Sequence, residues 1–324
     1  MTLELLQYDF MQRALLAALL VGLAAPSVGV YIVQRRLALI GDGMGHLALA
    51  GVAIGVLTTG QPVLTALVVA VAGAIAIELI RARGRTSGDV ALAIMFYGGI
   101  AAGVVIISRA SGGTPANLTS YLFGAITTTS RADLWVFAIL AVGVLSVTLG
   151  LAPRLFAVSN DEEYARAVGL PVLQTNLLLA VITATTVVIS MRVVGLLLIS
   201  ALMVVPVATA QLVAGSFRTT LLLAVGIGVA VSLGGTTTSY YANTPSGGTI
   251  VLLAVGLFAL TSLSTALRAA LRRDVHDEAE DHLHQHGPGC GHPVVSHEGH
   301  LDYVHDGHRH APHGAHYDEH YEQH

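Results

Sequence analysis

The sequence contains no lysine, because all 16 of its Lys and Arg residues are arginines. A P-loop nucleotide site needs a lysine that reaches the phosphates, so the chain cannot hydrolyse ATP by that route. Its one cysteine, Cys290, excludes a framework of internal disulfides. The His-Glu-x-x-His motif is also absent, which leaves an intramembrane zinc protease of that kind without support.

Charged residues are scarce as well. They make up 11% of the chain, whereas 54% of it is hydrophobic and its mean hydropathy is +0.70. A soluble domain carries about 25% charged residues. The composition is therefore that of an integral protein of the lipid bilayer, and we expect no nucleic-acid partner.

Long apolar runs dominate the first 270 residues. A membrane-spanning helix needs roughly 20 mostly apolar residues. Segments of about that length lie at 11–34, 39–59, 62–80, 89–109, 132–152, 174–191, 193–214, 219–238 and 248–268. We therefore predict an all-α fold, a polytopic bundle of about eight to nine transmembrane segments. Proline and glycine interrupt several runs, so that some are candidates for half-helices.

The arginines are distributed unevenly between the loops. If the segments alternate in direction, the clusters at 35–36, 81–85, 154–166 and 268–273 all fall on one side of the membrane. Cytoplasmic loops carry an excess of arginine, so we assign this side to the cytoplasm. The N-terminus is then outside and the C-terminal tail inside, although an even number of spans would move the N-terminus inside.

Histidine is concentrated in the tail. Fourteen of the 15 histidines lie between His276 and His324, among acids and glycines and few large apolar residues. Such a segment cannot bury a core, so we predict two domains, 1–273 in the membrane and a tail, 274–324, that is disordered when metal-free. Imidazole favours zinc, copper, nickel and iron. An engineered tag would show an uninterrupted histidine run, which is absent. The candidate tail ligands are His282, His284, His286, His292, His297, His300, His305, His308 and His310.

The remaining histidine, His46, lies in an apolar run four residues after Asp42. In a helix, this spacing places both side chains on one face. Ionisable groups at membrane depth are costly, which favours a role in handling metal ions or protons. Alternatively, Asp42 caps a helix and His46 packs in the bundle. Two ligands do not hold zinc alone, but two Asp-His pairs facing each other across a two-fold axis would offer four.

Two further segments are candidates for contact with a partner. Residues 160–171 read as a short polar helix that begins with acids, including Glu162 and Glu163, and ends near a glycine. This is either an ordinary surface helix or a docking element. The second segment contains Pro206, Ala208 and Gln211, where a proline in an apolar run can mark a turn at the membrane face.

Four stretches together resemble the permeases of bacterial ABC transporters for zinc and manganese. They are Ala38–His46, the acidic helix that ends at Ala167–Leu170, Val194–Pro206 and Pro245–Leu252. The resemblance covers roughly residues 10–270, in order and with suitable spacing. Family members often have Ser-His where this chain has Gly45-His46, a departure that leaves Asp42 and His46 in place. The histidine-rich tail lies outside the family pattern.

The resemblance implies a multi-pass protein of the bacterial inner membrane that acts as a homodimer. It also implies two separate cytoplasmic ATP-binding subunits and an extracytoplasmic metal-binding protein, which agrees with the missing lysine. The permease would work by alternating access and would not be an enzyme. We expect no tightly bound cofactor, with Zn²⁺ as substrate and tail ligand. Asp42 and His46 are carried over as the transport pair, and Glu162, Glu163, Pro206, Ala208 and Gln211 as candidates for coupling to the ATPase.

Other functions remain open at this point. The same machine could import manganese or iron instead of zinc. A proton-coupled metal exporter is another class, although such proteins usually need several intramembrane ligands and here His46 is the only intramembrane histidine. A third class is a membrane-anchored metal sensor whose tail responds to the metal.

Overall fold

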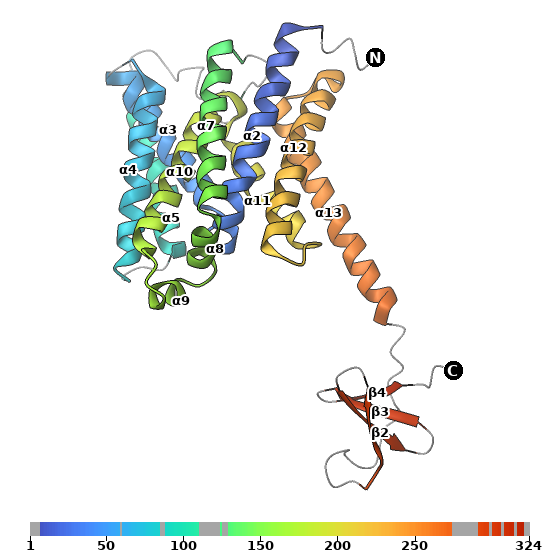
Figure 1. Cartoon of the computed structure of the whole chain (residues 1–324). Helices are drawn as coiled ribbons and strands as arrows, with labels where there is room; N and C mark the ends of the chain where they lie inside the picture. Colours follow the sequence, from blue (N-terminus) through green and yellow to red (C-terminus); the bar gives the residue numbers. More distant parts are fainter. Residues whose placement is uncertain are drawn as a thin grey trace. The chain divides into compact units, whose positions relative to one another are not determined.

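Nine helices occupy the nine apolar segments of the sequence, within a few residues at each end (Figure 1). They are α2 (Asp9–Gln34), α3 (Ile40–Thr58), α4 (Pro62–Ala82), α5 (Gly88–Ile107), α7 (Arg131–Gly150), α10 (Val172–Val194), α11 (Leu196–Gln211), α12 (Phe217–Ala242) and α13 (Ser246–Arg273). Within the part of the chain that the structure describes, eight of these are long and apolar enough to cross a membrane, and α11 is shorter. The predicted all-α membrane bundle is confirmed.

The structure is a computed structural model that describes residues 7–58, 60–84, 88–109, 124, 129–273, 291–297, 300–305, 308–313 and 316–320. The chain divides into two compact units, Met1–Thr261 and Ser262–His324, each of which is described by itself. The boundary between these units falls inside α13, so the predicted domain boundary after residue 273 stays a prediction.

Small residues let the helices of the first unit approach closely. A β-carbon added to Gly29 of α2 would lie 1.9 Å from the carbonyl oxygen of Met203 in α11. Farther along α2, the buried Tyr31 hydroxyl donates a hydrogen bond of 2.6 Å to the carbonyl oxygen of Thr148 in α7. Close packing and interhelical hydrogen bonds are the main forces between helices in lipid, and through them α2 is held against α7, α11 and α12.

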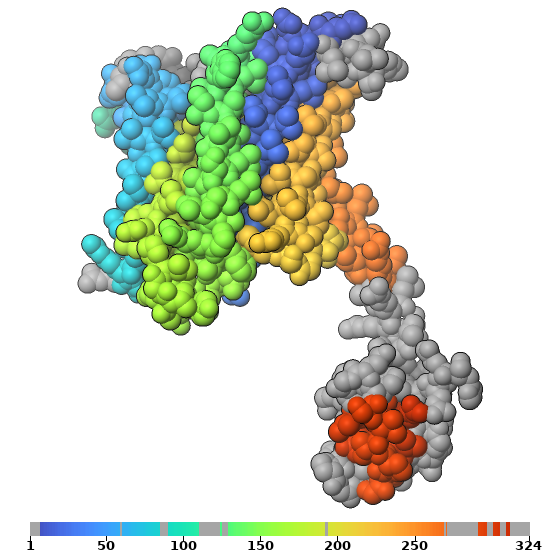
Figure 2. All heavy atoms as spheres, viewed as in Figure 1, coloured from blue at the N-terminus to red at the C-terminus, as the bar shows by residue number. Residues whose placement is uncertain are grey.

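Large apolar side chains remain exposed on the outside of the bundle. Trp135 and Ile139 of α7 are 73% and 71% exposed, and Leu252 of α13 is 74% exposed. In Figure 2, α7 (green) runs along the face that is shown. Apolar exposure of this degree on several helices is what a bilayer solvates, in agreement with a multi-pass membrane protein.

Two short helices close one end of the bundle, α8 (Ala152–Asn160) and α9 (Glu162–Ala167), opposite the end where α2 begins (Figure 1). Asp161 caps α9, because its carboxylate accepts hydrogen bonds of 2.9 Å from the backbone N–H groups of Glu163 and Tyr164. The chain leaves α9 through Gly169, whose φ of +79° favours glycine. The predicted short polar helix is therefore present.

A sharp turn at one residue separates α10 from α11. Gly195 has φ 86° and ψ 153°, a conformation that is essentially restricted to glycine. In contrast, Pro206 does not break its segment. It lies buried inside α11, which continues to Gln211, so the turn expected at Pro206 is wrong.

The tail also differs from the prediction of disorder, because its described part forms an antiparallel sheet in the order β1-β2-β3-β4. The strands are β1 (Val294–His297), β2 (His300–His305), β3 (His308–His313) and β4 (His316–His320). Only two residues join each strand to the next, and the first two joints read Glu298-Gly299 and Asp306-Gly307. Glycine at such a joint is a strong hairpin signal, which the compositional argument for disorder overlooked.

Candidate functional site

Asp42 and His46 lie one turn apart near the start of α3, and both are half-buried. Asp42 occupies the first turn, where a carboxylate is favoured by the positive end of the helix dipole. It lines a cavity of about 440 Å³ together with Leu39, Phe96 and Tyr97. The ring of Phe96 meets the ring of His46 edge-on, with centroids 4.5 Å apart. Asp42 therefore borders a hollow between α3 and α5, and His46 contacts Phe96, one of the residues that line it.

The backbone around this pair is packed closely on two sides. A β-carbon on Gly45 would lie 1.8 Å from Cδ1 of Leu196 in α11, and one on Gly99 of α5 would lie 2.7 Å from the backbone nitrogen of Leu47. The glycines thus let α11 and α5 approach α3 next to His46. At Gly99 the contact is with the backbone of α3, so a side chain there would push α5 away from α3 beside His46.

The pair supplies two metal ligands within one chain. Among the side chains that the structure describes, no group of three or more His, Cys, Asp or Glu lies close enough to hold a metal ion. A stable four-coordinate site would need further ligands. The role of Asp42 and His46 in metal handling stays a prediction.

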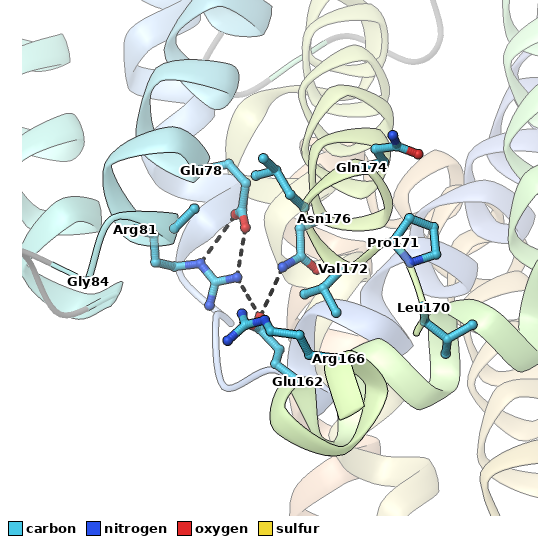
Figure 3. A pocket seen from close by; sticks show the side chains of 12 residues that line it. Glu78, Arg81, Gly84, Glu162, Arg166, Leu170, Pro171, Val172, Gln174 and Asn176 are labelled. Carbon is cyan, nitrogen blue, oxygen red and sulfur yellow. Dashed lines mark hydrogen bonds and ion pairs between the residues drawn. The ribbon is translucent and has the colours of Figure 1, made fainter. Parts of the chain in front are cut away.

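A second group of polar residues gathers where α2, α4, α9 and α10 meet. This polar cluster consists of Arg35, Glu78, Arg81, Glu162 and Asn176 (Figure 3 shows all but Arg35). Oε1 of Glu78 lies 3.3 Å from Nη2 of Arg35 and 2.7 Å from Nη2 of Arg81. Oε1 of Glu162 accepts hydrogen bonds from both arginines and, at 3.1 Å, from Nδ2 of Asn176. Two acids and two bases thus share four ion pairs.

The cluster is largely shielded from solvent. The side chains of Arg35 and Glu78 are only 4% and 3% exposed. Burial lowers the pKa of Arg35, and the Glu78 carboxylate opposes that shift. Burial by itself would raise the pKa of Glu162, but the hydrogen bond and charge of Arg81 and the charge of Arg35 outweigh it and lower that pKa.

The sequence led us to group Glu162 and Glu163 as two equivalent acids, and the structure separates them. Glu162 joins the polar cluster, whereas Glu163 is exposed on the outside of α9. Glu78 lies near the end of an apolar segment of the sequence, and it pairs with Arg81, three residues along the chain. Its burial and its link to Arg35 were missed, although a glutamate near the end of an apolar segment is a usable signal.

The candidate coupling residues of α11 lie in different surroundings. Pro206 is buried, Ala208 is half-buried and Gln211 is exposed at the end of the helix. Two exposed apolar residues, Leu212 and Val213, follow Gln211 directly. Of the three candidates, Gln211 is the one placed for direct contact with another protein. A role for any of them in coupling stays a prediction.

The candidate ligands of the tail are only partly described. His282, His284 and His286 lie outside the described residues. His292 precedes the sheet, and His297, His300, His305 and His308 occupy strand ends beside the two-residue joints. His310 lies inside β3 and is 3% exposed.

Comparison with known proteins identifies close relatives of the first unit. Residues 7–265 match the ABC 3 transport family. The manganese transport system membrane protein MntC of Halalkalibacterium halodurans is 33% identical over 270 residues, which are 83% of this chain and 92% of that protein. A probable metal transport system membrane protein of Treponema pallidum is 33% identical over 271 residues, which are 82% of this chain and 99% of that protein.

Solved structures agree with these sequence matches. PsaBC from Streptococcus pneumoniae, in complex with Fab, aligns with a TM-score of 0.71 and 30% identity over 81% of this chain and 95% of that chain. An inward-facing conformation of a putative metal-chelate type ABC transporter aligns with a TM-score of 0.66 at 16% identity, over 78% of this chain and 86% of that chain, which supports the fold alone.

Proposed function

This chain belongs to the ABC 3 transport family, and we propose that it is the permease subunit of an ATP-driven importer of divalent metal ions, with zinc as its substrate. The observation that carries the proposal is the Asp42–His46 pair, one turn apart near the start of α3 in a membrane bundle, with Asp42 at the edge of a hollow. The absence of lysine leaves the chain without a P-loop, so ATP hydrolysis belongs to a separate subunit.

Two arguments bear on the metal. Imidazole and carboxylate together suit Zn²⁺, and the histidine-rich tail adds many more imidazoles. Manganese is the second candidate, because relatives such as MntC of Halalkalibacterium halodurans and ScaB of Streptococcus gordonii are named for manganese transport. A site with one nitrogen and one oxygen donor per chain is compatible with either ion.

A second copy of the chain would complete the metal site. Leu39 and Tyr97 border the same cavity as Asp42 and are 67% and 70% exposed, and Ile94 of α5 is 66% exposed. Such a surface fits a partner that excludes lipid from the hollow. In a two-fold dimer, the two Asp-His pairs would together offer four donors. Because each half is incomplete, the ion is released when the halves separate, as transport requires.

The polar cluster offers a route from the ATPase to the metal pair. In this proposal, α8 and α9 contact the cytoplasmic ATP-binding subunit, and the exposed Glu163 and Tyr164 of α9 belong to the contact surface. Glu162 connects α9 to Arg35, which lies at the end of α2 and seven residues before Asp42. A displacement of α9 during ATP hydrolysis would therefore reach the segment that leads into α3, and an extracytoplasmic binding protein would deliver the ion on the other side.

The test is uptake of radioactive zinc and manganese by metal-starved cells that express the chain with its ATPase and binding protein. We expect Asp42→Asn with His46→Gln to abolish zinc uptake at unchanged membrane abundance. The matched control is Thr58→Ala, an exposed position at the other end of α3, which should transport normally.

Three outcomes would change the proposal. Normal zinc uptake by the double variant would remove Asp42 and His46 from the pathway. Uptake of manganese but not zinc by the intact chain would replace the substrate. Uptake without ATPase activity would overturn the whole mechanism.

A further inference from the structure

A groove lies between α2 and α7 at the end of the bundle where both helices begin, opposite α8 and α9 (Figure 1). It has a volume of about 480 Å³, which is within the range of sites that bind small molecules. The residues that line it recur at helical spacing along one face of each helix. Neither the Asp42–His46 pair nor the polar cluster contributes to this lining. The groove is therefore separate from both sites described above.

The lining of the groove changes from polar to apolar along both helices in the same direction. The polar residues stand first, and they are Asp9, Gln12, Arg13 and Arg131. The apolar residues follow on the same helix faces, and they are Leu16, Leu19, Leu20, Leu134, Trp135 and Ala138. The last apolar residue of each helix lies seven residues after the arginine, which is about 10 Å along a helix. Half of the hydrocarbon core of a bilayer is about 15 Å thick, so the apolar part has the depth of one leaflet.

The polar end of the groove has an excess of positive formal charge, because two arginines stand against Asp9. The nearby Asp133 carboxylate accepts hydrogen bonds of 3.0 and 2.6 Å from the backbone N–H and the hydroxyl of Ser130. In the part of the chain that the structure describes, neither Arg13 nor Arg131 forms an ion pair. Arg13 donates from Nε to the carbonyl oxygen of Asp9, at 3.2 Å, which leaves its two terminal NH₂ groups for another acceptor. Guanidinium groups bind phosphate oxygens strongly, often through two parallel hydrogen bonds.

The apolar end of the groove is exposed on the outside of the bundle. Trp135 is 73% exposed and Leu16 is 49% exposed. Tryptophan is enriched where the headgroups of a bilayer meet its hydrocarbon, and Trp135 lies one helical turn beyond Arg131. A protein outside the bilayer would reach the arginines but not the leucines that lie at membrane depth. An amphiphile with a negatively charged head and an apolar chain fits both ends of the groove.

We propose that this groove binds an anionic phospholipid such as phosphatidylglycerol. Its phosphate lies between Arg13 and Arg131, and one acyl chain lies along the leucines of α2. The excess positive charge selects this lipid over a zwitterionic one. Since Asp9 opposes one of the two arginines, we expect a preference of about fivefold, the effect of roughly one net basic residue near a membrane surface. The proposal goes beyond the proposed transport function and does not depend on the transported metal.

Trp135 is the only tryptophan of the chain, so tryptophan fluorescence reports on this groove alone. The test is quenching of that fluorescence by phospholipids with brominated acyl chains, in the purified full chain in phosphatidylcholine nanodiscs. Brominated phosphatidylglycerol and brominated phosphatidylcholine are compared at the same small mole fraction. We expect the apparent association constant to be about fivefold larger for phosphatidylglycerol.

The site variant combines Arg13→Gln with Arg131→Gln and should lose this preference. The matched control combines Arg83→Gln with Arg218→Gln, two exposed arginines outside the groove, and should keep it. Thermal unfolding identifies a variant that does not fold. If the site variant fails in this way, Arg131→Gln alone, at the exposed first residue of α7, replaces it under the same criteria.

Several results would overturn the proposal. Equal quenching of the intact chain by the two lipids would show that the groove does not select charge, and a retained preference in the site variant would show that the arginines do not bind the headgroup. An equal loss in the site variant and the control would reduce the effect to diffuse attraction by arginine. Absence of quenching by either lipid would show that lipid does not occupy the groove. Quenching by brominated phosphatidylethanolamine as strong as that by phosphatidylglycerol would refute the choice of an anionic lipid.

Discussion

The polar cluster makes a quantitative prediction for Glu78→Gln. This change keeps the shape of the side chain and removes one of two carboxylates that face Arg35 and Arg81. The cluster then carries one uncompensated positive charge beside side chains that are 4% and 21% exposed. Removal of one partner of a buried ion pair lowers the free energy of unfolding by about 3–5 kcal/mol. For a domain of this size, such a loss lowers Tm on the order of 10 °C, measurable by thermal unfolding of the detergent-solubilised protein.

A second substitution in the cluster should compensate for the charge that Glu78→Gln leaves unbalanced. Arg81→Gln alone leaves the cluster with one negative charge in excess, whereas combining it with Glu78→Gln restores neutrality. We expect the double variant to recover at least half of the loss caused by Glu78→Gln. The control is Arg83→Gln, an exposed position two residues along the chain, which should cost less than about 0.5 kcal/mol. The reasoning is refuted if Glu78→Gln is no worse than this control, or if the two single losses simply add.

Three further predictions follow from the packing, the pKa shift and the surface. Gly29→Ala should destabilise the bundle by about 1–3 kcal/mol, because the added β-carbon meets the Met203 backbone. Gly143→Ala, with open space around it, should be neutral or slightly stabilising. Thermal unfolding of both variants checks this. Because the pKa of Glu162 is lowered in the folded protein, its ionised carboxylate contributes to stability above the ordinary value of 4.5, and this contribution is lost as the pH falls through the lower folded pKa. Glu162→Gln should therefore flatten the acid side of a plot of Tm against pH. An unchanged acid side would contradict this. Glu163→Lys should weaken co-purification of the ATP-binding subunit at unchanged Tm, and a fall in Tm without loss of the subunit would show that Glu163 is structural.

Hydropathy was sufficient to predict the membrane bundle. All nine apolar segments became helices, because a segment that is apolar throughout has no stable alternative to the helix in lipid. The short polar helix was also predictable, since Asp161 and the following acids are an N-terminal signature that depends on neighbouring residues alone. Features that depend on local sequence alone could therefore be predicted.

The polar cluster was not predictable, because its members come from positions 35, 78, 81, 162 and 176. Nothing in the spacing of these residues shows that the ends of α2 and α4 meet α9. The same limit applies to Asp42, whose cavity depends on how α5 packs beside α3, and to the contact of His46 with Phe96 of α5. In the tail, the composition argued for disorder, while the glycines between the histidines already contained the hairpin signal.

The sheet of the tail constrains how this part of the chain changes in evolution. β2 and β3 have six residues each and are each followed by a joint of two, so the pattern repeats every eight residues and His297, His305 and His313 are equally spaced. Insertion of a single residue within a strand would move every following residue of that strand to the other face and break register pairs such as His305 with His308. Duplication of one eight-residue unit would instead add a strand with its histidines in register. Tails of this type should therefore vary in length among relatives by multiples of eight residues.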